Sequence, residues 1–272
     1  MLIAQFSDMH LCASGALMFG HVDTAAALGR CVAHVNGLAP RPDVALITGD
    51  LTYDGQDAEY RTLRELLSAL AMPYYLIPGN HDHRGRLARA FADLAYLPRD
   101  GEFLHYVIED HPLRLIGLDT IVPGAAGGRM CAARLAWLER VLDARPDVPG
   151  VIFMHHPPFA TGIEAMDRIG LDGARALAAI VAGHGQIERV LCGHLHRPIQ
   201  SRWSGTIAQT APGTAHQVGL DLSPGAQVRM IMEPPPVLLH QWRPGRGMVS
   251  HTSYIGDYGA APAIPDDYAA AS

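Results

Sequence analysis

The sequence contains no lysine, and all 21 of its basic residues are arginine. Without a lysine amine the chain cannot use Schiff-base catalysis, attach pyridoxal phosphate or supply the phosphate-binding lysine of a P-loop. Its four cysteines, Cys12, Cys31, Cys131 and Cys192, lack the paired spacing of a zinc knuckle or a disulfide framework. We therefore expect unpaired thiols, which fit a reducing compartment.

Long apolar runs and a targeting leader are also missing. No segment reaches the roughly 18 apolar residues that cross a bilayer. The N-terminus has neither the basic region nor the cleavage site of a signal peptide. Residues Met1–Phe6 instead run directly into Ser7-Asp8, which predicts a first strand. We expect a cytoplasmic protein that makes no membrane contact.

Length and charge further restrict the class of protein and its partners. The 272 residues are 49% apolar and 18% charged, as in a compact enzyme with one large domain or a core and a small appendage. The formal net charge of −6 argues against nucleic acid and anionic membranes as partners.

The chain alternates short apolar runs with segments of helical periodicity, which predicts an α/β fold. The predicted strands include 2–6, 44–48, 74–77, 151–154 and 190–192, and the predicted helices include 24–38, 58–70, 135–142 and 174–181. Asp23 is the expected N-cap of the first helix. Two hairpins are expected as well, one over 103–118 and one over 237–254.

Polar clusters follow five of the predicted strands. In order they are Asp8-Met9-His10, Gly49-Asp50, Gly79-Asn80-His81-Asp82, His155-His156 and Gly193-His194-Leu195-His196. Ligands bind at the carboxyl ends of strands in open α/β sheets, so these clusters can converge on one cleft. An Asp-x-His or a His-x-His places both side chains on the same side of an extended chain.

Most of these clusters are weak evidence when taken singly. A His-x-His is expected roughly 0.8 times by chance in a chain with 15 histidines. A turn explains Gly49-Asp50. In His155-His156 one imidazole can bind a metal while the other supports it, and local packing is the alternative. Gly79-Asn80-His81-Asp82 is different, because the chain has two asparagines and the motif arises by chance about once in a thousand such chains.

The order of these five motifs resembles that of the calcineurin-like metallophosphoesterase superfamily, over residues 1 to about 200. The resemblance implies a four-layer α/β/β/α sandwich of two mixed sheets with flanking helices. It also implies two metal ions, one bound by Asp8, His10 and His196 and the other by Asn80, His155 and His194. Asp50 would bridge the two ions, and His81 would face the substrate.

More narrowly, the chain resembles bacterial class III phosphodiesterases, the group of glycerophosphodiesterases and 3′,5′-cyclic nucleotide phosphodiesterases. His155-His156-Pro157-Pro158 and the segment 212–217 carry this resemblance. It makes His216 a candidate substrate contact, although a structural turn explains the segment equally well. Gly49-Asp50-Leu51-Thr52-Tyr53 also fits purple acid phosphatases, but His10 already fills that coordination position, so we interpret Tyr53 as a packing residue.

The expected activity is hydrolysis of a small phosphate diester, either a cyclic nucleotide or a glycerophosphodiester, by a metal-bound hydroxide. His81 would act as the proton donor or hydrogen-bond donor. The mixed carboxylate, imidazole and amide ligands suit Fe, Mn, Zn or Co. The alternatives are a phosphomonoesterase, nucleotide pyrophosphatase or nuclease of the same superfamily, or a scaffold without activity.

We predict three regions in the chain. Residues 1–200 form the dinuclear catalytic core, and residues 201–255 add strands and a hairpin that complete the fold and can serve as a cap or dimerisation region. Residues 256–272 form a loose tail. The resemblance implies a homo-oligomer, either a dimer or an assembly of dimers.

Overall fold

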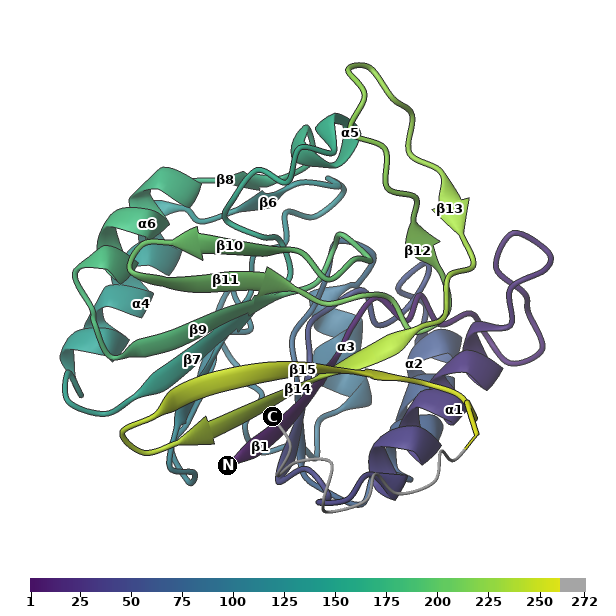
Figure 1. Ribbon diagram of the computed structural model, residues 1–272, viewed down its shortest axis with the longest axis horizontal. Helices are drawn as coiled ribbons and strands as arrows, with labels where there is room; N and C mark the ends of the chain where they lie inside the picture. The colour runs from purple at the N-terminus through teal and green to yellow at the C-terminus, as the bar shows by residue number, and fades with distance from the viewer. Residues whose placement is uncertain (260–272) are drawn as a thin grey trace, which may run out of the picture.

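A computed structural model describes residues 1–259, which form two mixed β-sheets with helices on their outer sides. The first sheet has the strand order β15-β14-β1-β2-β3, and the second has the order β10-β11-β9-β7-β5-β4. In Figure 1 the sheets lie between α4 and α6 at one end and α1, α2 and α3 at the other. This is the α/β/β/α sandwich expected from the sequence.

Parallel strands form the centre of the first sheet. Strands β1 (Leu2–Phe6), β2 (Val44–Ile47) and β3 (Tyr74–Leu76) run parallel to one another. Strand β14 (Pro236–Arg243) pairs antiparallel with β1, and β15 (Gly247–Tyr254) pairs antiparallel with β14. The last hairpin of the chain therefore extends the sheet that the first strand begins.

The second sheet has four parallel strands between two antiparallel edges. The parallel strands are β5 (Arg114–Leu118), β7 (Gly150–Met154), β9 (Ile187–Cys192) and β11 (Thr206–Thr210). The edge strands are β4 (Tyr106–Ile108) and β10 (Gln200–Trp203). Two small pairs stand apart: β6 (Gly128–Arg129) with β8 (Leu171–Asp172), and β12 (Gln217–Val218) with β13 (Met230–Ile231).

Each helix buries at least one apolar side chain. They are α1 (Thr24–Gly37), α2 (Asp57–Leu67), α3 (Arg84–Ala90), α4 (Ala132–Asp143), α5 (Glu164–Asp167) and α6 (Ala174–Ala182). Helix α1 begins where predicted, because the Asp23 carboxylate accepts a hydrogen bond from the Ala26 amide at 2.8 Å. Its side chains Leu28, Val32 and Val35 join the main core.

The two strands of the C-terminal hairpin differ in exposure. Strand β14 is largely buried, because it pairs with β1 on one side and with β15 on the other, so β15 alone forms the edge. Residues 260–272 of the predicted tail lie outside the described residues. Over residues 1–259, no helix is both long and apolar enough to span a bilayer.

Candidate metal centre

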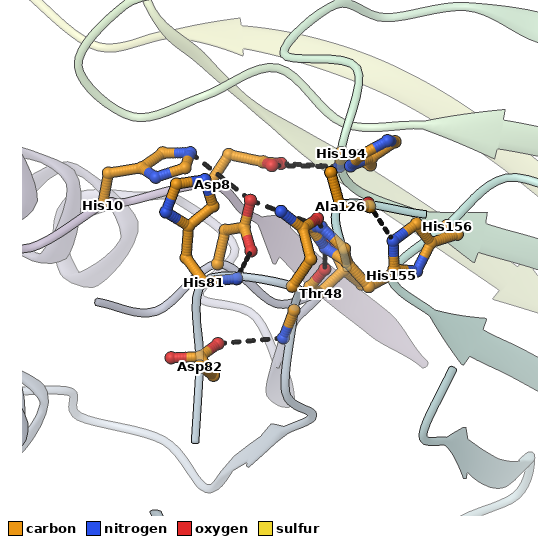
Figure 2. Close-up of polar contacts among 12 residues, drawn as sticks. Asp8, His10, Thr48, His81, Asp82, Ala126, His155, His156 and His194 are labelled. Atoms are coloured by element: carbon orange, nitrogen blue, oxygen red, sulfur yellow. Dashed lines mark hydrogen bonds and ion pairs between the residues drawn. The ribbon is translucent and has the colours of Figure 1, made fainter. Parts of the chain in front are cut away.

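The polar clusters meet at the ends of five strands, three from one sheet and two from the other. Strands β1, β2 and β3 of the first sheet and β7 and β9 of the second all end where these side chains meet. Figure 2 shows Asp8, His10 and His81 facing His155 and His194 across this junction of the two sheets. Residues separated by as many as 188 positions in the chain, such as Asp8 and His196, thus come into contact.

One half of the site is formed by His10, His196 and Asp8. The Nε2 atoms of His10 and His196 lie 3.0 Å apart, and Asp8 Oδ1 lies 3.4 Å from His196 Nε2. Asp50 completes this group, and one ligand atom from each of the four residues lies within 4.8 Å of the others. All four side chains are buried. Adjacent ligands of one ion at about 2.1 Å lie about 3 Å apart, so the spacing fits one cation.

The other half is formed by His155, Asn80 and His194. His155 Nε2 lies 3.0 Å from Asn80 Oδ1, and the rings of His155 and His194 meet at a centroid distance of 5.1 Å. His194 Nε2 donates to the backbone carbonyl of Ile169 at 3.1 Å, which leaves its Nδ1 as the free acceptor.

Asp50 lies between the two halves. Its Oδ2 atom is 3.5 Å from His10 Nε2 and 3.4 Å from His155 Nε2. Its Oδ1 atom accepts a hydrogen bond from the His81 amide at 2.9 Å. A single carboxylate oxygen that faces both groups suits a bridge between two ions.

The backbone is strained at most of these residues. Over residues 1–259, seven residues other than glycine have a positive φ, and five of them are Asp8, His10, Asp50, His194 and His196. A non-glycine residue in this region costs on the order of 1–3 kcal/mol, so it persists where the surrounding structure imposes it, commonly at functional sites.

Two glycines of the motifs lie where there is no space for a side chain. A Cβ at Gly79 would overlap the amide nitrogen and Oδ1 of Asp50. A Cβ at Gly193 would overlap the Ser7 hydroxyl and approach Asp8 Oδ2. These glycines let neighbouring loops approach closely enough to bring the carboxylates together.

Backbone carbonyls fix the histidine tautomers. His155 Nδ1 donates to the Thr48 carbonyl at 2.8 Å, and His196 Nδ1 donates to the His216 carbonyl at 3.2 Å. In the neutral form both rings therefore direct an unprotonated Nε2 toward the carboxylates, as in a metal ligand. The buried His10 Nδ1 has no hydrogen-bond partner.

The charges also favour a cation. Burial lowers the pKa of His155, but the negative charges of Asp50 and Asp8 outweigh burial and raise it to about 9. The carboxylates thus stabilise a positive charge at this position, and either a metal ion or a proton can supply that charge. Burial and the His155 charge lower the pKa of His194 to about 3, which keeps that imidazole neutral for binding.

His81 lies beside the centre and faces a cavity. Its Nδ1 donates to the Tyr53 carbonyl at 2.7 Å, and its ring meets His10 edge-on at 4.5 Å. Nε2 is therefore the atom that remains available to a ligand. The cavity measures about 390 Å³, and His216 also lines it, with its ring 4.6 Å from that of His196. Tyr53 packs edge-on to His10 at 6.4 Å.

Two further residues, Asp82 and His156, hold the segments of the site together. Asp82 accepts hydrogen bonds from the amides of Leu51 and Gly79, and from the hydroxyls of Thr52 and Tyr60, which ties the loop after β2 to the loop after β3. His156 bonds through both ring nitrogens, to Thr120 Oγ1 and the Ala126 carbonyl. His156 therefore supports its neighbours and has no free ring nitrogen for a ligand.

The sequence matches known proteins over most of its length. The family described as calcineurin-like phosphoesterase matches residues 1–198. A probable glycerophosphodiester phosphodiesterase GpdQ of Arcobacter nitrofigilis is 40% identical, over 95% of this chain and 94% of that protein. The 3′,5′-cyclic adenosine monophosphate phosphodiesterase CpdA of Pseudomonas aeruginosa is 33% identical, over 82% of this chain and 83% of that protein.

A solved structure supports the fold. A dimetal phosphatase from Danio rerio superposes with a TM-score of 0.64 at 16% sequence identity, over 94% of this chain and 99% of that one. At this identity the similarity concerns the arrangement of sheets and helices.

Proposed function

The chain belongs to the calcineurin-like phosphoesterase family, and from that premise we propose that it hydrolyses small phosphate diesters at a centre of two metal ions. The observation that carries this proposal is Asp50 Oδ2, which faces a histidine of each half-site at 3.4–3.5 Å. The relatives named as glycerophosphodiester and cyclic nucleotide phosphodiesterases support the diester class.

The ligands of the two ions follow from the two halves of the site. One ion would be held by Asp8, His10 and His196, and the other by Asn80, His155 and His194, with Asp50 shared. The donor set of imidazole, carboxylate and amide fits Fe, Mn, Zn or Co. When bound, two such cations neutralise the phosphoryl oxygens and lower the pKa of water at the site.

His81 would donate the proton to the leaving oxygen. The Tyr53 carbonyl holds a proton on Nδ1, so a proton given to the leaving oxygen comes from Nε2 of the imidazolium form. The amide of His81 also donates to Asp50 Oδ1 at 2.9 Å, which places the ring and the shared carboxylate on one short segment. His216, whose ring lies 5.5 Å from that of His10, would contact the substrate from the cavity wall.

Matched substrates test this function. Metal-loaded protein is expected to hydrolyse bis(p-nitrophenyl) phosphate faster than p-nitrophenyl phosphate. Parallel assays with 3′,5′-cyclic AMP and glycerophosphocholine separate the two diester classes. Asp50→Asn is the control for contaminating activity, because it removes the shared carboxylate charge. Faster turnover of the monoester would favour a phosphomonoesterase, and full metal occupancy without turnover of any ester would favour a scaffold.

We also propose a homo-oligomer, a dimer or an assembly of dimers, in which residues 201–255 take part. This region completes the fold around residues 1–200 and exposes Leu220, Leu222 and Met232 by about 60% each. Light scattering after size exclusion gives the mass of the assembly.

All four cysteines are unpaired, which agrees with the reducing cytoplasm that we propose as the location of the protein.

A further inference from the structure

A row of aromatic rings leads from the metal centre to the outer rim of the cavity. His81 lies next to His10 at 4.5 Å, and the Tyr53 ring stacks on His81 with a centroid distance of 6.0 Å and an interplanar angle of 27°. Phe19 then meets Tyr53 edge-on at 5.9 Å. All four rings line the same cavity, so the exposed outer ring is connected to the site by direct contacts.

The wall beside this row is apolar. Met18 and Val22 are buried with Cys12 in a small cluster, and both Tyr53 and Met230 pack against it. The cluster joins the loop after β1 to β13, two parts of the chain more than 200 residues apart. Further apolar side chains line the cavity, namely Ala126, Met166, Ile169, Val218 and Val228, together with the polar Gln217 and Arg229.

Phe19 occupies a position that does not suit its side chain. Its φ is +51°, and Gly20 follows with a φ of +76° in a turn closed by the bridge between Met18 and Val22. Asparagine, aspartate or glycine adopts this conformation with less strain than a bulky residue does. The ring is also 61% exposed, so it adds little to the core. A strained, exposed aromatic residue at a cavity rim points to contact with a ligand.

We propose that Phe19 and Tyr53 bind one ester arm of the diester, and that this arm is an aromatic or other flat apolar group. The inference rests on the proposed function, since it places the phosphoryl group at the metal centre. The arm on the His81 side of phosphorus then extends along Tyr53 toward Phe19. Aromatic groups gain from edge-to-face and offset contacts at centroid distances of about 4.5–7 Å, whereas a glycerol arm does not.

Two phosphonates with the same charged head group test this subsite. Phenylphosphonate and methylphosphonate are titrated by calorimetry into the manganese-loaded protein. The native protein is expected to bind phenylphosphonate about tenfold more tightly. Phe19→Ala is expected to remove most of that preference and to leave the affinity for methylphosphonate and the metal content unchanged. Phe19→Tyr keeps the aromatic ring and is expected to restore the preference.

Val249→Ala provides the matched control, because Val249 is 53% exposed on β15, away from the cavity lining. Equal affinity of the native protein for both phosphonates, binding of neither, or full preference in Phe19→Ala would overturn the inference. Hydrolysis of bis(p-nitrophenyl) phosphate is measured on the same samples. Hydrolysis without phenyl preference contradicts the aromatic subsite alone, whereas phenyl preference without hydrolysis of any diester contradicts the proposed function alone.

Discussion

The Nε2 atoms of His10 and His196 face each other at 3.0 Å in a buried site. His196 already donates through Nδ1 to the His216 carbonyl, so its Nε2 is unprotonated in the neutral ring. An unprotonated Nε2 this close to another ring nitrogen needs either a proton carried by that ring or a cation between the two nitrogens. Burial, the largest effect, holds the pKa of His10 well below its usual value, so the ring is neutral, and its Nε2 can either carry that proton or bind a metal ion in its place.

His196→Ala should therefore remove one of the two ions. Bound metal, measured by mass spectrometry on dialysed protein, should fall from about two ions per chain to about one, and kcat/KM for a diester should fall at least about a hundredfold. His251→Ala is the control, since His251 is an exposed histidine on β15. Unchanged metal content in His196→Ala would contradict its assignment as a ligand.

Gly79→Ala should disrupt the centre through backbone packing alone. The added Cβ would overlap the Asp50 amide and carboxylate, so we expect a loss of about 1–3 kcal/mol in the free energy of unfolding, together with weaker metal binding. Gly29→Ala lies within α1 and meets no atom within 4 Å, so it should stabilise the protein by up to about 1 kcal/mol. Urea unfolding measures both. Equal effects of the two substitutions would show that the close approach at Gly79 is unimportant.

His81→Ala should lower kcat by about 10²- to 10⁴-fold for a diester with an alkoxide leaving group, with both ions retained. The loss should be much smaller for a p-nitrophenolate leaving group, which departs without a proton. Steady-state rates on the two substrates measure this difference. An equal loss on both substrates would assign His81 to binding instead of proton donation, and loss of metal would make it part of the ligand set.

The stability of the first sheet should depend on pH through His240. This buried residue bonds to Gln5 Oε1 and Ser250 Oγ, and burial, followed by the positive charge of Arg189, lowers its pKa to about 3. In the unfolded chain the pKa is about 6.5. At pH values between these two pKa values the unfolded chain binds more protons at His240 than the folded protein does. The contribution of the neutral His240 to the free energy of unfolding is therefore complete above pH 6.5 and is lost as the pH falls.

His240→Gln should flatten this dependence. From pH 7.5 to pH 5 the native protein should lose about 2 kcal/mol more unfolding free energy than the variant does. Urea unfolding at a series of pH values, with metal chelated in both proteins, measures the difference. Parallel curves for the two proteins would mean that His240 titrates in the fold as it does in the unfolded chain.

Much of the fold was predictable because local patterns agree with the long-range pairing. The apolar run at Leu2–Phe6 and the Asp23 cap appear in the structure as predicted. Helix α3 was not predicted, since Arg84–Ala90 is short and lacks an apolar repeat. Strand β10 is polar and is recognisable only through its pairing with β11.

The candidate site could be assembled from motifs because each lies directly after a strand. The role of Asp82 could not be predicted, because its hydrogen-bond donors come from separate stretches that meet only in the folded chain. The same applies to Phe19, whose relation to Tyr53 and the cavity depends on the turn that presents it.

Anomalous diffraction from crystals grown with manganese is the most direct test of the dinuclear centre. Two peaks about 3.5–4 Å apart are expected, with Asp50 in contact with both, His10 and His196 at one and His155 and His194 at the other. A single peak, or peaks that Asp50 does not bridge, would contradict the proposed dinuclear centre.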